Sequence, residues 1–126
     1  MPYRLQQEMD PQQQAQDFRH AYGVENTPDN LAMQFRLIAE EYTEFRDAHY
    51  DEETEDAETL KELADLVYVA FQYAENMEWD LLTALKRVHE SNMSKLGDDG
   101  KPIRRHDGKI LKGPNYKEPD LTDLVE

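Results

Sequence analysis

The chain has 126 residues and a formal net charge of −14 at pH 7, with 38% hydrophobic and 33% charged residues. This length suits one domain with a modest core, and the polar composition suits helices with broad solvated faces or a core completed by a second chain. The acidic balance argues against nucleic acid polymers as partners, because their binding relies on Lys and Arg. The absence of cysteine excludes disulfides and thiolate metal sites.

No stretch resembles a signal peptide, and none approaches the roughly 20 apolar residues of a membrane span. We therefore expect a cytoplasmic protein with no membrane partner and a single domain over residues 1–126. The four histidines show no metal-ligand spacing, so we interpret them as surface or packing residues: His20, His49, His89 and His106.

A short helix is predicted after an extended arm over residues 1–9. Asp10 can cap this helix, Pro11 suits its first position, and Gly23 can end it.

Two long amphipathic helices are predicted next. The first runs from about residue 28 to 49, because its apolar residues recur at steps of four and three. An acidic connection over 51–56 separates it from the second, which runs from about residue 55 to 76. The residues of the second helix expected to face inward are Leu60, Leu63, Val67, Ala70, Phe71 and Ala74.

A fourth helix is predicted to begin near Trp79 and to end at Gly97. Long helices joined by short connections pack best as antiparallel neighbours. We therefore predict an all-α fold, an antiparallel bundle of four to five helices whose helical core spans about residues 10–97.

Residues 98–126 are predicted to form a basic, turn-rich C-terminal arm. Its Asp-Gly dipeptides at 99–100 and 107–108 are typical of turns, because glycine accepts positive φ at little cost. Residues 102–105 and 109–112 are candidates to pair as a small hairpin, followed by irregular chain.

Two pairs of carboxylates border the apolar stripes of the long helices: Glu41 with Glu44, and Glu62 with Asp65. The members of each pair are three residues apart and share one helix face. Gathered across an antiparallel interface, four carboxylates would repel one another unless a cation compensates. Oxygen ligands without sulfur favour Mg²⁺ or Mn²⁺, and Mg²⁺ takes phosphate oxygens as further ligands. The pattern favours a metal site for a di- or triphosphate compound over solvated acidic faces.

Glu40-Glu41-x-x-Glu44, followed after seventeen residues by Glu62-x-x-Asp65, resembles the E-E-x-x-E … E-x-x-D signature of the MazG-like all-α nucleoside triphosphate pyrophosphohydrolases. The resemblance covers about residues 28–96. It implies hydrolysis of a (deoxy)nucleoside triphosphate between the α and β phosphates. It also implies two or three Mg²⁺ ions per site, replaceable by Mn²⁺, with Glu41, Glu44, Glu62 and Asp65 as metal ligands.

The same resemblance assigns roles to residues around the metal ligands. Glu40 and Glu41 are the catalytic candidates, with Glu40 positioned to orient or deprotonate the attacking water. Asn92 and Lys95 fall where related enzymes place substrate-binding side chains, although a lysine that complements the helix dipole is the alternative for Lys95.

The densest basic cluster of the chain lies in the arm and comprises Arg104, Arg105, Lys109 and Lys112. We expect this cluster to close over the substrate phosphates or to reach a neighbouring subunit, with Arg104 and Lys109 as substrate contacts. A solvated arm is the alternative.

Three functions are compatible with these patterns. The first is a nucleoside triphosphate pyrophosphohydrolase, a homo-oligomer (dimer or tetramer) whose resemblance to small stand-alone enzymes favours a purine such as the guanine of dGTP. The second is a phosphoribosyl-ATP pyrophosphohydrolase of histidine synthesis, and the third is a non-catalytic helical interaction module. Four aromatic residues are candidates to stack on a base, but we expect each in the core: Phe18, Tyr22, Tyr68 and Trp79.

Overall fold

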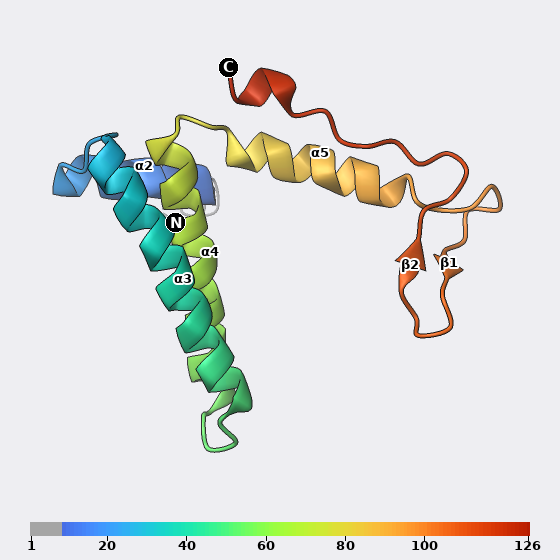
Figure 1. Ribbon diagram of the computed structural model, residues 1–126, viewed down its shortest axis with the longest axis horizontal. Helices are drawn as coiled ribbons and strands as arrows, with labels where there is room; N and C mark the ends of the chain where they lie inside the picture. The colour runs from blue at the N-terminus through green and yellow to red at the C-terminus, as the bar shows by residue number, and fades with distance from the viewer. Residues whose placement is uncertain (1–8) are drawn as a thin grey trace, which may run out of the picture. The chain divides into compact units, whose positions relative to one another are not determined.

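The computed structural model describes residues 9–126, so the arm predicted for residues 1–9 lies, apart from its last residue, outside the described chain. The chain divides into two compact units between Trp79 and Asp80. The first unit holds α2, α3 and α4, and the second holds α5, a two-stranded hairpin and a short 3₁₀ helix (Figure 1). The predicted all-α fold class is confirmed. None of the helices described for residues 9–126 combines the length and apolar character needed to cross a bilayer.

Helix α2 spans Pro11–Tyr22, as its start and stop signals predicted. The Asp10 carboxylate accepts a hydrogen bond from the backbone N–H of Gln13 at 2.8 Å, which satisfies one of the free donors of the first turn. Gly23 ends the helix at φ 63°, a left-handed conformation that favours glycine.

Helices α3 (Pro28–Tyr50) and α4 (Asp56–Asn76) form an antiparallel pair joined by a short acidic turn (Figure 1). Both match their predicted ranges to within one residue at each end. The carboxylate pair of α3 lies about two turns before the end of that helix, and the pair of α4 lies about two turns after its start. The hairpin therefore brings both pairs to the same level.

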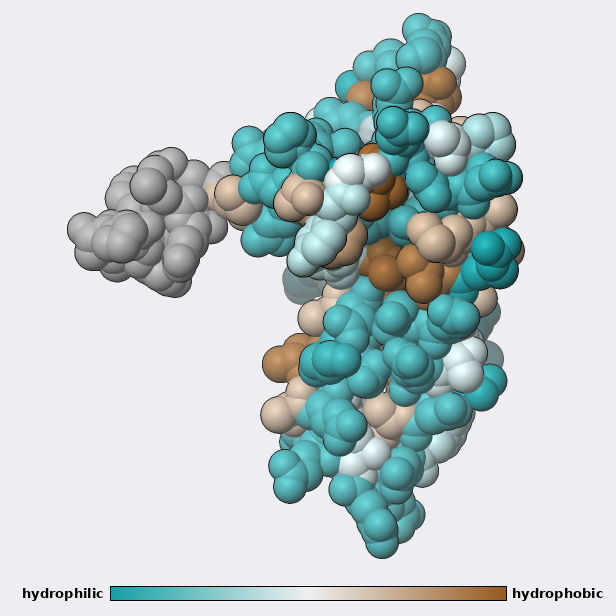
Figure 2. Space-filling model, turned by 90° about the vertical axis from the view of Figure 1, so that its left-hand side faces the viewer, coloured by the Kyte–Doolittle hydropathy of each residue, from teal (hydrophilic) through white to brown (hydrophobic). Residues whose placement is uncertain are grey.

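The buried apolar side chains of the described chain are few: Ala15, Phe71 and Ala74. Leu60, Leu63 and Val67 were expected to face inward, but they are 65%, 41% and 47% exposed. The expectation is wrong for the single chain because these residues lie on the side of α4 that faces away from α3. They line an apolar groove of about 390 Å³ between α4 and the start of α2. Figure 2 shows apolar side chains reaching the surface between hydrophilic ones.

Phe18 and Tyr22 also reach the surface, in contrast to their predicted core positions. The Phe18 ring lies 4.6 Å from the ring of Tyr22 and 5.9 Å from that of Tyr68, which is itself exposed. The three rings form a surface cluster because α2 covers only part of α4. Trp79 is half-buried beside Tyr73.

Arg19 joins α2 to α4 through a buried polar network. Its guanidinium donates to the side-chain oxygens of Asn76 at 2.6 Å, Asn26 at 2.8 Å and Gln72 at 3.2 Å. Burial lowers the pKa of Arg19, and the nearby charge of Glu75 opposes that shift. These hydrogen bonds hold α2 against α4, where few apolar side chains are buried between the two helices.

The second unit begins with α5 (Leu81–Met93), which ends before the predicted stop at Gly97. The Ser94 side chain explains the early end, because its hydroxyl donates to the carbonyl of Ser91 at 2.6 Å and accepts from the N–H of Lys117 at 3.0 Å. The Ser94 hydroxyl therefore links the end of α5 to the C-terminal segment at Lys117.

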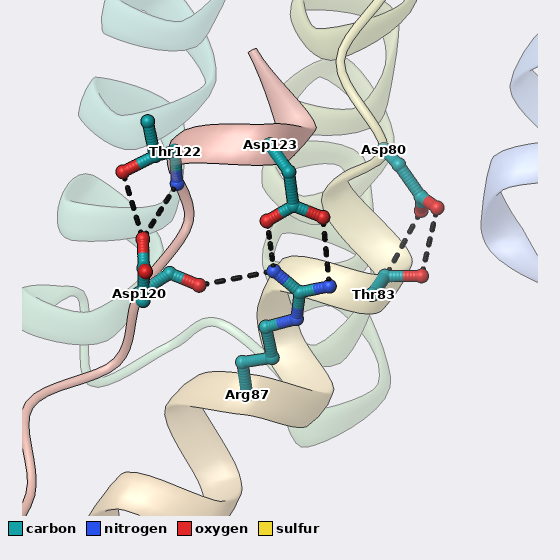
Figure 3. A network of polar contacts seen from close by, with 6 residues as sticks. All are labelled: Asp80, Thr83, Arg87, Asp120, Thr122 and Asp123. Carbon is teal, nitrogen blue, oxygen red and sulfur yellow. Dashed lines mark hydrogen bonds and ion pairs between the residues drawn. The ribbon is translucent and has the colours of Figure 1, made fainter. Parts of the chain in front are cut away.

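The arm contains the predicted hairpin, with β1 (Ile103–Arg104) antiparallel to β2 (Ile110–Leu111). The chain then runs back along α5 to the 3₁₀ helix η1 (Thr122–Leu124). Arg87 of α5 holds this returning segment by a two-pronged ion pair with Asp123, at 2.5 and 3.1 Å (Figure 3).

Replacing Arg19 by Met should lower the free energy of unfolding by about 2–4 kcal/mol, because several buried oxygens lose their donor. Urea denaturation followed by circular dichroism measures the change. Arg36→Met, at an exposed position of α3, is the control and should stay within about 0.5 kcal/mol of the wild type. Equal stabilities of the two variants would contradict a structural role for Arg19.

Candidate metal centre

Four carboxylates meet across the α3–α4 interface. Glu41 of α3 and Glu62 and Asp65 of α4 each offer an oxygen atom, and the three atoms lie within 4.8 Å of one another. Glu44 lies close enough to Glu41 to raise its pKa. The structure therefore brings together all four residues predicted as metal ligands; their role as ligands stays a prediction.

Burial makes this carboxylate cluster costly without a cation. The Oε2 atoms of Glu41 and Glu62 are buried and have no hydrogen-bond partner. The pKa of Glu41 is raised to about 7, first by loss of hydration, then by the hydrogen bond to Glu44 and by the negative charges of Glu44, Asp65 and Glu62. Buried, unpaired carboxylate oxygens are unfavourable, and a bound cation is one way to satisfy them.

Lys61 contacts the carboxylate cluster and was not singled out by the sequence analysis. Its Nζ lies 2.9 Å from Oδ2 of Asp65 and 3.7 Å from Oε1 of Glu62. These contacts raise the pKa of Lys61. The available signal was its spacing, since a lysine four residues before an aspartate on one helix commonly pairs with it.

Glu40 lies outside this group of oxygens. It is exposed on α3, about 100° around the helix axis from Glu41. Its catalytic role therefore stays a prediction.

The other predicted substrate contacts belong to the second unit. Asn92 is exposed near the end of α5, and Lys95 is half-buried just beyond it. In the hairpin, Arg104 donates to the carbonyl of Gly108 at 3.3 Å, and Lys109 is exposed. Their approach to the carboxylate cluster stays a prediction.

All four histidines are exposed, which agrees with their interpretation as surface residues.

Gln34 is a buried polar residue that the sequence analysis also missed. It is 5% exposed, and its Oε1 has no hydrogen-bond partner. Glu41 follows it seven positions later, so both lie on one face of α3, about 10 Å apart along the axis. The burial of Gln34 could not be predicted from the sequence, because one polar residue does not change the helical spacing of the apolar residues around it.

The donor set of the cluster fits a hard divalent cation. Its ligand atoms are carboxylate oxygens, and two of the buried oxygens lack a partner. Mg²⁺ and Mn²⁺ prefer such oxygens, whereas zinc more often takes nitrogen or sulfur.

A family model described as phosphoribosyl-ATP pyrophosphohydrolase matches residues 3–92. The matched range includes the whole of α2, α3 and α4, most of α5, and all four carboxylates. A search of curated proteins found no match.

The raised pKa of Glu41 predicts a pH-dependent stability when metal is removed with EDTA. Because the folded chain binds this proton more tightly than the unfolded chain, the stabilisation present below about pH 4.5 is lost as the pH rises through about 7. Between pH 5 and 8 the wild type should lose about 2 kcal/mol relative to Glu41→Gln. Urea denaturation at each pH measures the difference; a difference between wild type and variant that stays constant from pH 5 to pH 8 would contradict the assignment.

Proposed function

The chain belongs to the phosphoribosyl-ATP pyrophosphohydrolase family, within the MazG-like superfamily, and we propose that it hydrolyses a nucleoside triphosphate between the α and β phosphates. The products are then a nucleoside monophosphate and pyrophosphate. The observation that carries this proposal is the cluster of carboxylate oxygens within 4.8 Å, on residues that the family match covers.

We assign the metal site to Glu41, Glu44, Glu62 and Asp65, with two or three Mg²⁺ ions that Mn²⁺ can replace. When bound, such ions neutralise phosphate charge and make hydroxide available near neutral pH. The four carboxylates keep fixed positions relative to one another because they project from two packed helices.

The remaining predicted site residues complete the proposal. Glu40, exposed on the same helix as Glu41, is assigned to orient or deprotonate the attacking water. Lys95, Arg104 and Lys109 are assigned to the phosphates, and Asn92 to the sugar or a phosphate. Lys95, Arg104 and Lys109 supply positive charge, which binding of a triphosphate requires in an acidic chain.

Phosphoribosyl-ATP, an intermediate of histidine synthesis, is the second candidate substrate, and the description of the matching family favours it. It shares with a nucleoside triphosphate the bond that would be cleaved. Among the nucleoside triphosphates, dGTP or another purine deoxynucleotide is the predicted substrate.

A panel of ribo- and deoxynucleoside triphosphates and phosphoribosyl-ATP, each supplied with Mg²⁺, tests the reaction. We expect pyrophosphate and a monophosphate product, with kcat reduced at least about 100-fold in Asp65→Asn because a metal ligand is lost. Glu53→Gln, in the exposed turn between α3 and α4, is the charge-matched control and should retain activity. Release of orthophosphate and a diphosphate would exclude the proposed bond, and no release from any compound would exclude the enzyme.

We also propose that the protein is a homo-oligomer, a dimer or tetramer, in which a second copy covers the apolar groove of α4. Leu60, Leu63 and Val67 line this groove, on the side of α4 roughly opposite Glu62 and Asp65. Exposed apolar side chains of this size, set in a chain with a small core, are stabilised by burial against another apolar surface.

Analytical ultracentrifugation should therefore give a mass at least twice the 14.8 kDa of one chain. Val67→Glu should weaken the association at least about 10-fold, because it places a charge in the covered groove. Glu53→Gln should leave the association unchanged. A wild type that sediments as a monomer at micromolar concentration would rule out this interface.

A further inference from the structure

Lys61 extends from α4 to the exposed edge of the carboxylate cluster. Its side chain is 67% exposed, whereas those of Asp65 and Glu62 are 35% and 13% exposed. The ammonium therefore lies toward solvent, and the oxygens without partners lie deeper between the helices. The exposed edge of the cluster is therefore formed by Lys61 and Asp65.

The contact between Lys61 and Asp65 places a positive charge where a divalent cation would bind. Oδ2 of Asp65 is 2.9 Å from the Lys61 Nζ, so a metal ion that takes this oxygen must displace the ammonium or be repelled by it. The long, flexible lysine side chain allows that displacement with little change in the backbone.

We propose that Lys61 is the counter-ion of the metal-free centre and that, on metal binding, its ammonium moves from Asp65 to a phosphate of the substrate. This inference rests on the proposed function and adds a substrate-binding residue to it. It also sets an order, in which a divalent ion binds before the nucleotide. Lys61 thus compensates negative charge in both states, first that of a carboxylate and then that of a phosphate.

The first test measures Mn²⁺ binding without nucleotide, by electron paramagnetic resonance of the free ion. Lys61→Met should bind Mn²⁺ about fivefold more tightly than the wild type, because the competing charge is gone. Lys61→Arg keeps the charge and should stay within about twofold of the wild type. Lys86→Met, at an exposed position of α5, changes the net charge equally and should have no effect.

The second test measures binding of inorganic tripolyphosphate by calorimetry at saturating Mn²⁺. Lys61→Met should bind this probe about 10-fold more weakly than the wild type, whereas Lys61→Arg should retain most of the affinity. Circular dichroism and urea denaturation confirm that the variants fold, and Lys61→Gln replaces Lys61→Met if the latter does not.

The outcomes separate this inference from the proposed function. A wild type that binds no Mn²⁺ would exclude the metal centre itself. If the wild type binds Mn²⁺ and Lys61→Met binds it no more tightly, Lys61 is not the counter-ion. Tighter Mn²⁺ binding with unchanged tripolyphosphate binding would overturn the transfer to phosphate, and with it the proposal.

Discussion

Repulsion between carboxylates at the α3–α4 interface is the constraint on which the first unit depends. The two helices pack closely, and that packing holds the oxygens of Glu41, Glu62 and Asp65 within 4.8 Å. Apolar burial elsewhere must offset this repulsion, because like charges at such distances are unfavourable when hydration is reduced. A bound cation would reduce the repulsion between these carboxylates and so stabilise the folded unit. The same cost that weakens the metal-free fold therefore favours metal binding.

The first unit compensates for its small core with polar contacts. Arg19 ties α2 to α4 through amide side chains, and Gln12 and Gln16 both donate to Glu75 on the same helix. Hydrogen bonds of this kind depend on geometry, so they fix how α2 lies on α4, whereas apolar contacts alone would allow it to slide. This arrangement leaves Leu60, Leu63 and Val67 of α4 exposed.

The helices of the first unit were predictable because their start signals act locally. Asp10 caps its own helix, and the spacing of each carboxylate pair fixes a shared helix face within a few residues. The end of α5 was not predictable, because Ser94 is held by Lys117, a distant residue that leaves no local pattern. The helical spacing of apolar residues in α4 likewise predicted an apolar stripe that includes Leu60. That spacing could not show whether another part of the same chain covers the stripe. Lys61 was missed because pairing lysines are common on helix surfaces.

The C-terminal segment of the second unit is attached to α5 at separate points along its length. Gly113 lies so close to the carbonyl oxygens of Lys95 and Leu96 that a Cβ would overlap them. Lys117 bonds to Ser91 of α5 and to Ser94 just beyond its end, and Asp123 pairs with Arg87. These contacts are largely exposed and share no apolar core, so one can break while the others remain. Amide hydrogen exchange along this segment then proceeds by stepwise fraying from its end, at a lower free energy than unfolding of the α3–α4 pair.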